Sequence, residues 1–264
     1  MADVIIVSAG QGKRMSVPPM ATSKGRCDDV IAPPPKYWSH RTRSKSVWSG
    51  NVPKPYIKLK GASIIALTLK VFNEIKEIDN IIIVTHPDWI NFCSSEIVEK
   101  LGFKKVKLVI NGGPKRQDSV KMGLDAISST PMASPDTLLI HDAVRPFITP
   151  DFISHLIEMG AKYGAAVPAL PATNTIKLIE NGFVLRTLQR NNLYEIQTPQ
   201  VFKYNIIKEA YEKAYSCGFY GTDDAELVER IHLPVKIVPG LPSNIKITTP
   251  EDLLYGERLM KMIK

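Results

Sequence analysis

Cysteine is scarce in this chain: of 264 residues only Cys27, Cys93 and Cys217 are cysteines, and they lie far apart. They form no Cys-x-x-Cys pair, and the five histidines form no His-Glu-x-x-His motif. These spacings argue against a disulfide framework and against a structural zinc site. We expect the thiols to be buried or incidental.

Long apolar runs are missing as well, so no segment is expected to cross a bilayer. The chain opens with Met1-Ala2-Asp3 and continues directly into Val4–Val7, without the basic and apolar regions of a secretory leader. We expect a cytoplasmic protein with no membrane partner.

Positive charge is in excess, with a net charge of +8. Residues 16–51 hold six lysines and arginines against two aspartates, together with five prolines and no hydrophobic periodicity. This composition predicts an irregular, basic, Pro-rich insertion. Outside it the chain is only mildly basic, and the charge alone allows either a small polyanion or nucleic acid as ligand.

Buried-strand patterns alternate with helical patterns along most of the chain. Strands are predicted at 4–8, 80–85, 107–110, 137–140 and 165–169, and helices at 63–74, 88–100, 119–127, 150–163, 204–217 and 250–262. Such alternation predicts one α/β domain over 1–264, with a mostly parallel sheet covered on both faces.

Residues 173–190 differ from this pattern. Two alternating runs, 175–179 and 183–187, flank Glu180-Asn181-Gly182, and Asn-Gly between such runs is a strong hairpin signal. Because an isolated hairpin is marginally stable in water, we expect this arm to pack against something, and a second subunit is a reasonable candidate.

Chemically suggestive residues follow the predicted strands, at the edge where parallel sheets bind ligands. A glycine loop, Ala9-Gly10-Gln11-Gly12-Lys13-Arg14, follows the first strand and could bring backbone N–H groups and an arginine to a phosphate. Its spacing fits neither a dinucleotide fingerprint nor a Walker A loop, and a simple strand–helix turn is the alternative. Gly112-Gly113 ends another predicted strand, a helix is expected to begin near Arg116, and Ser119 could face a ligand from its first turn. Considered alone, this motif is better explained as a simple strand–helix turn.

A carboxylate ends the strand at 137–140. Asp142, in His141-Asp142-Ala143-Val144-Arg145, is the best candidate to hold Mg²⁺ or a hydroxyl group, whereas His141 is expected to be a packed or orienting residue. Lys54 follows Pro53, and Lys246 lies within a strand-like stretch near the end of the fold. A single lysine is ordinarily a solvated surface charge, so neither is decisive alone.

Together these blocks resemble the 2-C-methyl-D-erythritol 4-phosphate cytidylyltransferase family. The blocks that carry the resemblance are Ala9–Met15, Pro53-Lys54, Gly112–Val120, His141–Phe147, Thr175-Ile176-Lys177, Gln197-Thr198-Pro199-Gln200, Thr222-Asp223-Asp224-Ala225 and Asn244-Ile245-Lys246. They occur in order over nearly the whole chain, apart from 16–51, and are specific only in combination.

The resemblance implies a Rossmann-like nucleotidyltransferase domain, a hairpin arm that makes a homodimer, and transfer of CMP from CTP to the polyol phosphate with Mg²⁺. It implies that Arg14 and Lys54 stabilise the transition state and that Lys246 and Arg190 position the polyol phosphate. Arg190 and Thr175 would serve the neighbouring subunit's site. The remaining implied contacts are the nucleotide site at Ala9, Gly10, Gly12, Gly113 and Ser119, and the substrate site at Asp142, Arg145, Thr198 and Thr222.

Three departures from the family pattern concern the same regions. Arg14 and Lys54 are 40 positions apart, where relatives have only a few residues between them. Pro114 and Asn174 stand where relatives often have acidic residues. Because loop-closure entropy grows slowly with length, Lys54 can still reach the site if 16–51 loops out.

Two other functions stay open on the sequence. A cytidylyltransferase for ribitol or ribulose 5-phosphate would share the CTP blocks. A non-catalytic protein that binds nucleotides or nucleic acid is suggested by Lys36-Tyr37-Trp38-Ser39-His40-Arg41, which mixes aromatic and basic residues as single-strand binders do. The joint presence of Arg14, Lys54, Asp142 and Lys246 favours the enzyme, and we do not expect a nucleic-acid partner.

Overall fold

The computed structural model describes residues 1–9, 52–130 and 134–262. The predictions for Gly10, Gly12, Arg14 and the insertion at 16–51 lie outside these residues. The strands are β1 (Ala2–Val7), β2 (Lys58–Leu59), β3 (Ala62–Ser63), β4 (Ile78–Thr85), β5 (Val106–Asn111), β6 (Thr137–Asp142), β7 (Ala165–Pro171), β8 (Lys177–Glu180), β9 (Phe183–Thr187), β10 (Tyr194–Ile196), β11 (Gln200–Lys203) and β12 (Lys236–Pro239). The helices are α1 (Ile64–Glu74), α2 (Ile90–Phe92), α3 (Arg116–Ser129), α4 (Pro150–Tyr163), α5 (Tyr204–Ser216), α6 (Asp224–Arg230) and α7 (Pro250–Met262), with short turns of 3₁₀ helix at Lys54–Tyr56, Pro87–Trp89 and Arg190–Asn192 and a π-helix at Cys93–Glu99.

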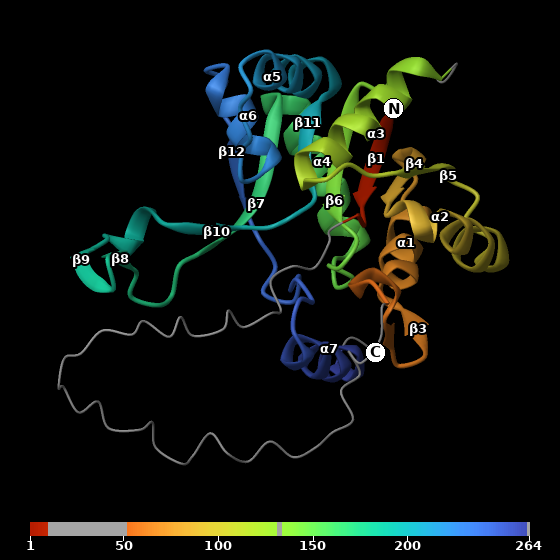
Figure 1. Cartoon of the computed structure of the whole chain (residues 1–264), viewed down its shortest axis with the longest axis horizontal. Coiled ribbons are helices and arrows are strands. Elements are labelled where there is room, and N and C mark those ends of the chain that lie inside the picture. Colours follow the sequence, from red (N-terminus) through yellow and green to blue (C-terminus); the bar gives the residue numbers. More distant parts are fainter. Residues whose placement is uncertain (10–51, 131–133, 263–264) are drawn as a thin grey trace, which may run out of the picture.

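The centre of the molecule is an eight-stranded mixed sheet (Figure 1). Its order is β10-β7-β11-β6-β1-β4-β5, with β12 pairing with β7. β1 pairs in parallel with β4 and β6, and β4 in parallel with β5, whereas β11 runs antiparallel between β6 and β7. The predicted α/β class with a mostly parallel sheet is therefore confirmed.

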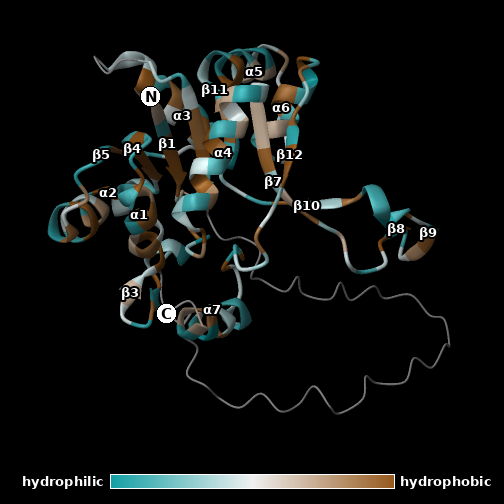
Figure 2. Cartoon of the chain, turned by 180° about the vertical axis from the view of Figure 1, so that it is seen from behind, coloured by the Kyte–Doolittle hydropathy of each residue, from teal (hydrophilic) through white to brown (hydrophobic). Residues whose placement is uncertain are grey.

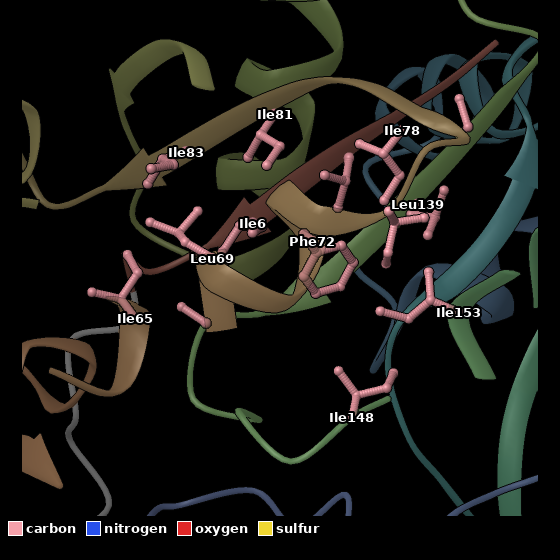
Figure 3. Close-up of a cluster of buried hydrophobic side chains, with 14 of the residues drawn as sticks. Ile6, Ile65, Leu69, Phe72, Ile78, Ile81, Ile83, Leu139, Ile148 and Ile153 are labelled. Carbon is pink, nitrogen blue, oxygen red and sulfur yellow. The ribbon is translucent and has the colours of Figure 1, made fainter. Parts of the chain in front are cut away.

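The two faces of this sheet are buried by different helices, because successive side chains of a strand point to opposite sides. Ile6 packs with α1 and α4, in the cluster that contains Phe72 and Ile153 (Figure 3). Its neighbour Ile5 packs on the other face, with α3, α5 and α6. Burial of both faces explains why β1 and β4 read as continuous apolar runs, and in Figure 2 these strands are brown.

A third apolar cluster lies beside the chain segment that precedes α1. Ile57 and Leu59 pack there against Phe147, Ile247 and α7. This cluster brings the segment with Lys54 and the segment with Lys246 to the same side of the molecule.

The predicted hairpin is present as β8 and β9, which pair antiparallel and project from the body of the protein (Figure 1). Asn181 and Gly182 at its turn have φ of 49° and 84°, the left-handed conformations that such a turn requires. Its strands are exposed along their whole length in a single chain. No helix in the described ranges is long and apolar enough to span a membrane.

The structure refines two sequence predictions and adds short elements. The segment expected to be helical at 88–100 is helical, but as a succession of 3₁₀, α and π turns. Lys246 does not lie in a strand but in an extended irregular segment. The strands β2, β3, β10, β11 and β12 and the helix α6 were not predicted, because each has only two to seven residues and little periodicity.

Candidate active site

Asp142 is the centre of a cluster of charges at the carboxyl end of β6. Its Oδ2 lies 2.7 Å from Lys246 Nζ and 3.6 Å from Arg145 Nε, and its Oδ1 lies 3.3 Å from Arg116 Nε. The cations come from three different places: α3, the turn after β6, and the segment before α7. The sheet therefore gathers at one point residues that lie more than a hundred positions apart in the sequence.

This arrangement keeps Asp142 ionised. Burial acts to raise the pKa of its carboxyl group, but Arg116, Lys246 and Arg145 together hold that pKa well below its ordinary value. Only 8% of the Asp142 side chain is exposed, whereas 43% of the Lys246 side chain is. The buried carboxylate thus holds the ammonium group of Lys246, while the rest of the lysine side chain stays accessible to a ligand.

His141 is buried directly behind Asp142, as an orienting residue. Its Nε2 faces the carbonyl oxygen of Arg145 at 3.1 Å, so Nε2 carries the proton and Nδ1 accepts one from the Thr198 hydroxyl at 3.1 Å. Thr198 Oγ1 in turn accepts the backbone N–H of Asp142 at 3.1 Å. Burial lowers the pKa of His141 to about 4, so the ring is neutral at pH 7. Both hydrogen bonds of the Thr198 hydroxyl therefore stabilise the end of β6.

The segment that carries Lys246 is tied to the same strand end. Arg145 Nη1 donates to the carbonyl oxygen of Asn244 at 2.8 Å, and the fully buried Asn244 donates from Nδ2 to the carbonyl oxygen of Thr198 at 2.9 Å. Gln197 Nε2 donates to the carbonyl oxygen of Leu241 at 2.9 Å. These bonds hold irregular backbone in place, which is how Lys246 can be positioned without a strand.

A second group of predicted residues meets where β1, β5 and α3 converge. A Cβ atom added to Gly112 would lie 2.3 Å from Ala9 Cβ and 2.8 Å from Ser119 Oγ, so only glycine fits there. Ser119 Oγ accepts the backbone N–H of Gly113 at 3.2 Å. Ala9, Gly112, Gly113 and Ser119 thus lie together at the ends of β1 and β5.

Lys54 lies in the 3₁₀ turn that follows the undescribed residues 10–51. Two residues later the buried Tyr56 hydroxyl makes a 2.6 Å hydrogen bond with Thr85 Oγ1 at the end of β4, and its ring stacks on Trp89. Thr85 Oγ1 also lies 3.3 Å from Ser8 Oγ. The Lys54 turn is therefore anchored to the ends of β1 and β4 independently of the insertion.

Three predicted residues are not brought to Asp142 within one chain. Arg190 and Thr175 lie on the projecting arm, where Arg190 Nη1 donates to the carbonyl oxygen of Thr173 at 2.7 Å. Thr222 is exposed and donates from its hydroxyl to Glu226 Oε2 at 2.9 Å. Their predicted roles stay predictions.

Two further charged residues at the site, the half-buried Arg116 and the buried Asp224, were assigned no role by the sequence. Arg116 and Asp224 form an ion pair of 2.7 Å between Nη2 and Oδ2. Each lies inside a block that carried the resemblance, but only the folded chain reveals that α3 and α6 begin side by side.

Comparison with known proteins agrees with this geometry. Residues 45–262 match the sequence model of the family described as 2-C-methyl-D-erythritol 4-phosphate cytidylyltransferase. The protein of that name from Geotalea uraniireducens is 44% identical over 213 residues, which cover 81% of this chain and 91% of that protein. The protein of the same name from Clostridioides difficile is 37% identical and covers 100% of this chain and 95% of its own length.

Solved structures give the same result. The crystal structure of 4-diphosphocytidyl-2C-methyl-D-erythritol synthase from Anaerococcus prevotii matches with a TM-score of 0.74 and 28% identity, over 98% of this chain and 96% of that chain. The 2-C-methyl-D-erythritol 4-phosphate cytidylyltransferase structure from Francisella tularensis matches with a TM-score of 0.72 and 26% identity, over 97% and 98%. The chain therefore belongs to the 2-C-methyl-D-erythritol 4-phosphate cytidylyltransferase family.

Proposed function

We propose that this enzyme transfers CMP from CTP to 2-C-methyl-D-erythritol 4-phosphate, giving 4-diphosphocytidyl-2-C-methylerythritol and pyrophosphate in isoprenoid precursor synthesis. The observation that carries the proposal is the convergence of Lys246, Arg116 and Arg145 on Asp142, in a chain whose residues 45–262 match the family.

The chemistry needs cations more than it needs a nucleophilic side chain. An oxygen of the polyol phosphate attacks the α-phosphorus of CTP, the bond to the β-phosphate oxygen breaks, and pyrophosphate leaves with its electron pair. Two anions have to meet, and the charge on the phosphoryl oxygens must be stabilised as it is redistributed. Fixed positive groups at a sheet edge supply both functions without a covalent intermediate.

The site residues divide into three groups by position. Lys246, with Arg145 and Asp142 behind it, would position the polyol phosphate, and Thr222 lies on the turn before α6. Lys54 would act on the phosphates of CTP, together with Arg14, which lies outside the described residues. Ala9, Gly113 and Ser119 would hold the nucleotide against the ends of β1 and β5, together with Gly10 and Gly12, which lie outside the described residues.

The described residues around Asp142 do not form a site for a permanently bound metal ion. Both of its carboxylate oxygens face cations, and no cluster of three or more acidic, histidine or cysteine side chains that could hold a metal occurs in the described ranges. Mg²⁺ commonly binds through substrate phosphates and only one or two carboxylates. We propose that Mg²⁺ arrives as the metal complex of CTP and is part of the substrate.

A homodimer through the 173–190 arm completes the proposal. Leu178, Ile179, Phe183, Val184 and Leu185 are 40–79% exposed on the arm. Apolar surface of this kind is costly to leave in water and is typical of an interface. Pairing of two arms would bury it and would bring Thr175 and Arg190 to the neighbouring subunit. The cytoplasmic location stays a prediction.

The first test is pyrophosphate release with CTP and Mg²⁺, comparing methylerythritol 4-phosphate and ribitol 5-phosphate as acceptors. We expect turnover with the first and little with the second. The reverse preference would establish the ribitol alternative. If folded protein turns over neither acceptor, the proposed cytidylyltransferase activity is contradicted. A gel shift that disappears when residues 16–51 are deleted would then favour the nucleic-acid-binding alternative.

A further inference from the structure

A buried carboxylate lies behind the charge cluster at Asp142. Asp224, the first residue of α6, is 1% exposed and faces the start of α3. Its Oδ2 accepts a hydrogen bond from Arg116 Nη2 at 2.7 Å, and its Oδ1 accepts one from the buried Tyr211 hydroxyl at 2.6 Å. Both oxygens of Asp224 are therefore directed by protein groups.

The backbone of Asp224 is fixed as well. Gln200, at the start of β11, accepts the N–H groups of Asp224 and Ala225 on its Oε1, at 3.1 and 3.0 Å. Its Nε2 donates to Asp223 Oδ2 at 2.7 Å, and Asp223 Oδ1 caps α6 by accepting the N–H of Glu226. The carboxylate thus has one allowed position, set by a sheet strand and a helix start.

Arg116 joins this buried assembly to the active site. Its Nη2 is held by Asp224 and its Nε by Asp142 Oδ1, whereas Nη1 has no hydrogen-bond acceptor among the described residues. The side chain keeps 28% of its surface exposed. A planar guanidinium held along one edge presents the rest of its fork to the space beside Asp142.

Electrostatics supports an anionic ligand at that space. Three cations, Arg116, Arg145 and Lys246, face two carboxylates, Asp142 and Asp224, so one positive charge is uncompensated. Although burial acts to lower the pKa of Arg116, the neighbouring Asp224 and Asp142 raise it above its ordinary value. Arg116 therefore stays charged at any working pH.

We infer that Arg116 is a further substrate-binding residue, which contacts a phosphate of the substrates, and that Asp224 is the positioning residue that aims it. This inference rests on the proposed function for the identity of the phosphates. An arginine is required because a single group must bridge two carboxylates with separate nitrogens and still offer a third to the ligand. A lysine carries the charge but cannot make these contacts simultaneously.

The kinetic test compares R116Q, R116K and D224N with two controls that change charge on the same helix, K121Q and D125N. Lys121 and Asp125 pair with each other, away from the cluster. We expect kcat/KM to fall about 100-fold in R116Q and R116K and about 10-fold in D224N, and to stay near wild type in the controls. D224N should have no further effect in an R116Q background, because Asp224 acts through Arg116.

A binding test separates this inference from the proposed reaction. Binding of CTP and binding of 2-C-methyl-D-erythritol 4-phosphate are measured separately by calorimetry. Affinity for the substrate whose phosphate Arg116 contacts should weaken at least tenfold in R116Q relative to K121Q, whether or not the protein turns over. If R116Q leaves Asp224 uncompensated and does not fold, R116Q/D224N removes both charges and replaces it. Wild-type protein without turnover would contradict the proposed function alone. Affinities for both substrates within threefold of the controls would overturn the role of Arg116 in binding, and additive losses of kcat/KM in the double variant would overturn that of Asp224.

Discussion

At the scale of single residues, the contacts of Lys246 separate its chemical role from a structural one. Its ammonium group pairs with Asp142, but Arg116 and Arg145 also face that carboxylate, so the buried charge stays compensated when the lysine is removed. A buried carboxylate with no remaining partner would cost several kcal/mol, as observed when one member of a buried pair is deleted. Here we expect that cost to be avoided.

Lys246→Ala should therefore lower kcat by about 100-fold or more while the melting temperature stays close to that of the wild type. Pyrophosphate release and a thermal melt measure the two effects. Lys236→Ala, at an exposed lysine on β12, is the matched control. Near-normal turnover in Lys246→Ala would remove this lysine from the mechanism.

His141 makes stability depend on pH. Burial lowers its pKa from 6.5 to about 4, so the unfolded chain binds more protons than the folded one between these values. This contribution to the free energy of unfolding is fully present above pH 6.5 and decreases as the pH falls toward 4, by about 3 kcal/mol in total. The lowered pKa of Asp142 adds a loss of the same sign at lower pH.

The measurement is the free energy of unfolding in denaturant between pH 7 and pH 4. His141→Asn cannot take up a proton and should flatten the slope, even if it is less stable at pH 7. His155→Asn, at an exposed histidine of α4, should keep the wild-type slope. An unchanged slope in His141→Asn would mean that other groups carry the acid sensitivity.

At the scale of elements, the sequence predicted what is long and periodic. The bounds of α4 and α7 agree with the prediction, because Pro150 and Pro250 mark their first residues and the apolar spacing continues to their ends. β11 was missed because its four residues, Gln200–Lys203, are defined by antiparallel pairing with β6 and β7. That pairing is a tertiary fact with little local signal.

The contact between α4 and β11 offers a test at this scale. Gly160 lies inside α4, and a Cβ atom added there would be 2.5 Å from Cγ1 of the buried Val201. Helix propensity favours alanine over glycine by about 1 kcal/mol, whereas overpacking costs about 1–3 kcal/mol. Because Val201 is β-branched and enclosed, we expect the overpacking to prevail.

Gly160→Ala should thus lower the free energy of unfolding by about 1 kcal/mol, against the direction of helix propensity. Denaturant unfolding measures it, with Glu158→Ala on the exposed face of α4 as the control. In a Val201→Ala background, Gly160→Ala should lower the free energy of unfolding by less than it does in the wild type, since the added methyl group then has room. A stabilised Gly160→Ala protein would show that β11 can move away.

At the scale of the whole molecule, the sequence predicted the fold and the line of motifs but not how they meet. Asp142, Arg145 and Lys246 were each singled out, and the sheet places them in contact. Arg116 and Asp224 lie in blocks that were noted, but their ion pair was not predicted, because it joins helices that start 108 positions apart. Pairings of this range depend on topology, and a single sequence does not encode them as a local pattern.

The site of one chain also lacks residues that the arm carries. Arg190 makes a hydrogen bond to the backbone of Thr173 and contacts none of the residues around Asp142, while the arm projects from the body with its apolar side chains exposed (Figure 1). In a two-fold dimer the same surface of both subunits forms the interface. If the arms form that interface, each arm would extend toward the active site of the other subunit. Each active site would then combine the Lys246 of one chain with the Arg190 of the other.

Mixed dimers of Arg190→Ala and Lys246→Ala chains test this arrangement. If the arm serves its neighbour, one site of every heterodimer regains both wild-type residues, whereas the other site loses both. Random mixing in equal amounts makes about half of the dimers mixed, so activity should recover to about a quarter of the wild-type value. Each variant alone should stay inactive, and unequal tags on the two chains allow the mixed dimer to be isolated and measured. If the purified mixed dimer is as inactive as its parents, each arm acts on its own chain, and a single chain would have to fold its arm back toward Asp142 to complete the site.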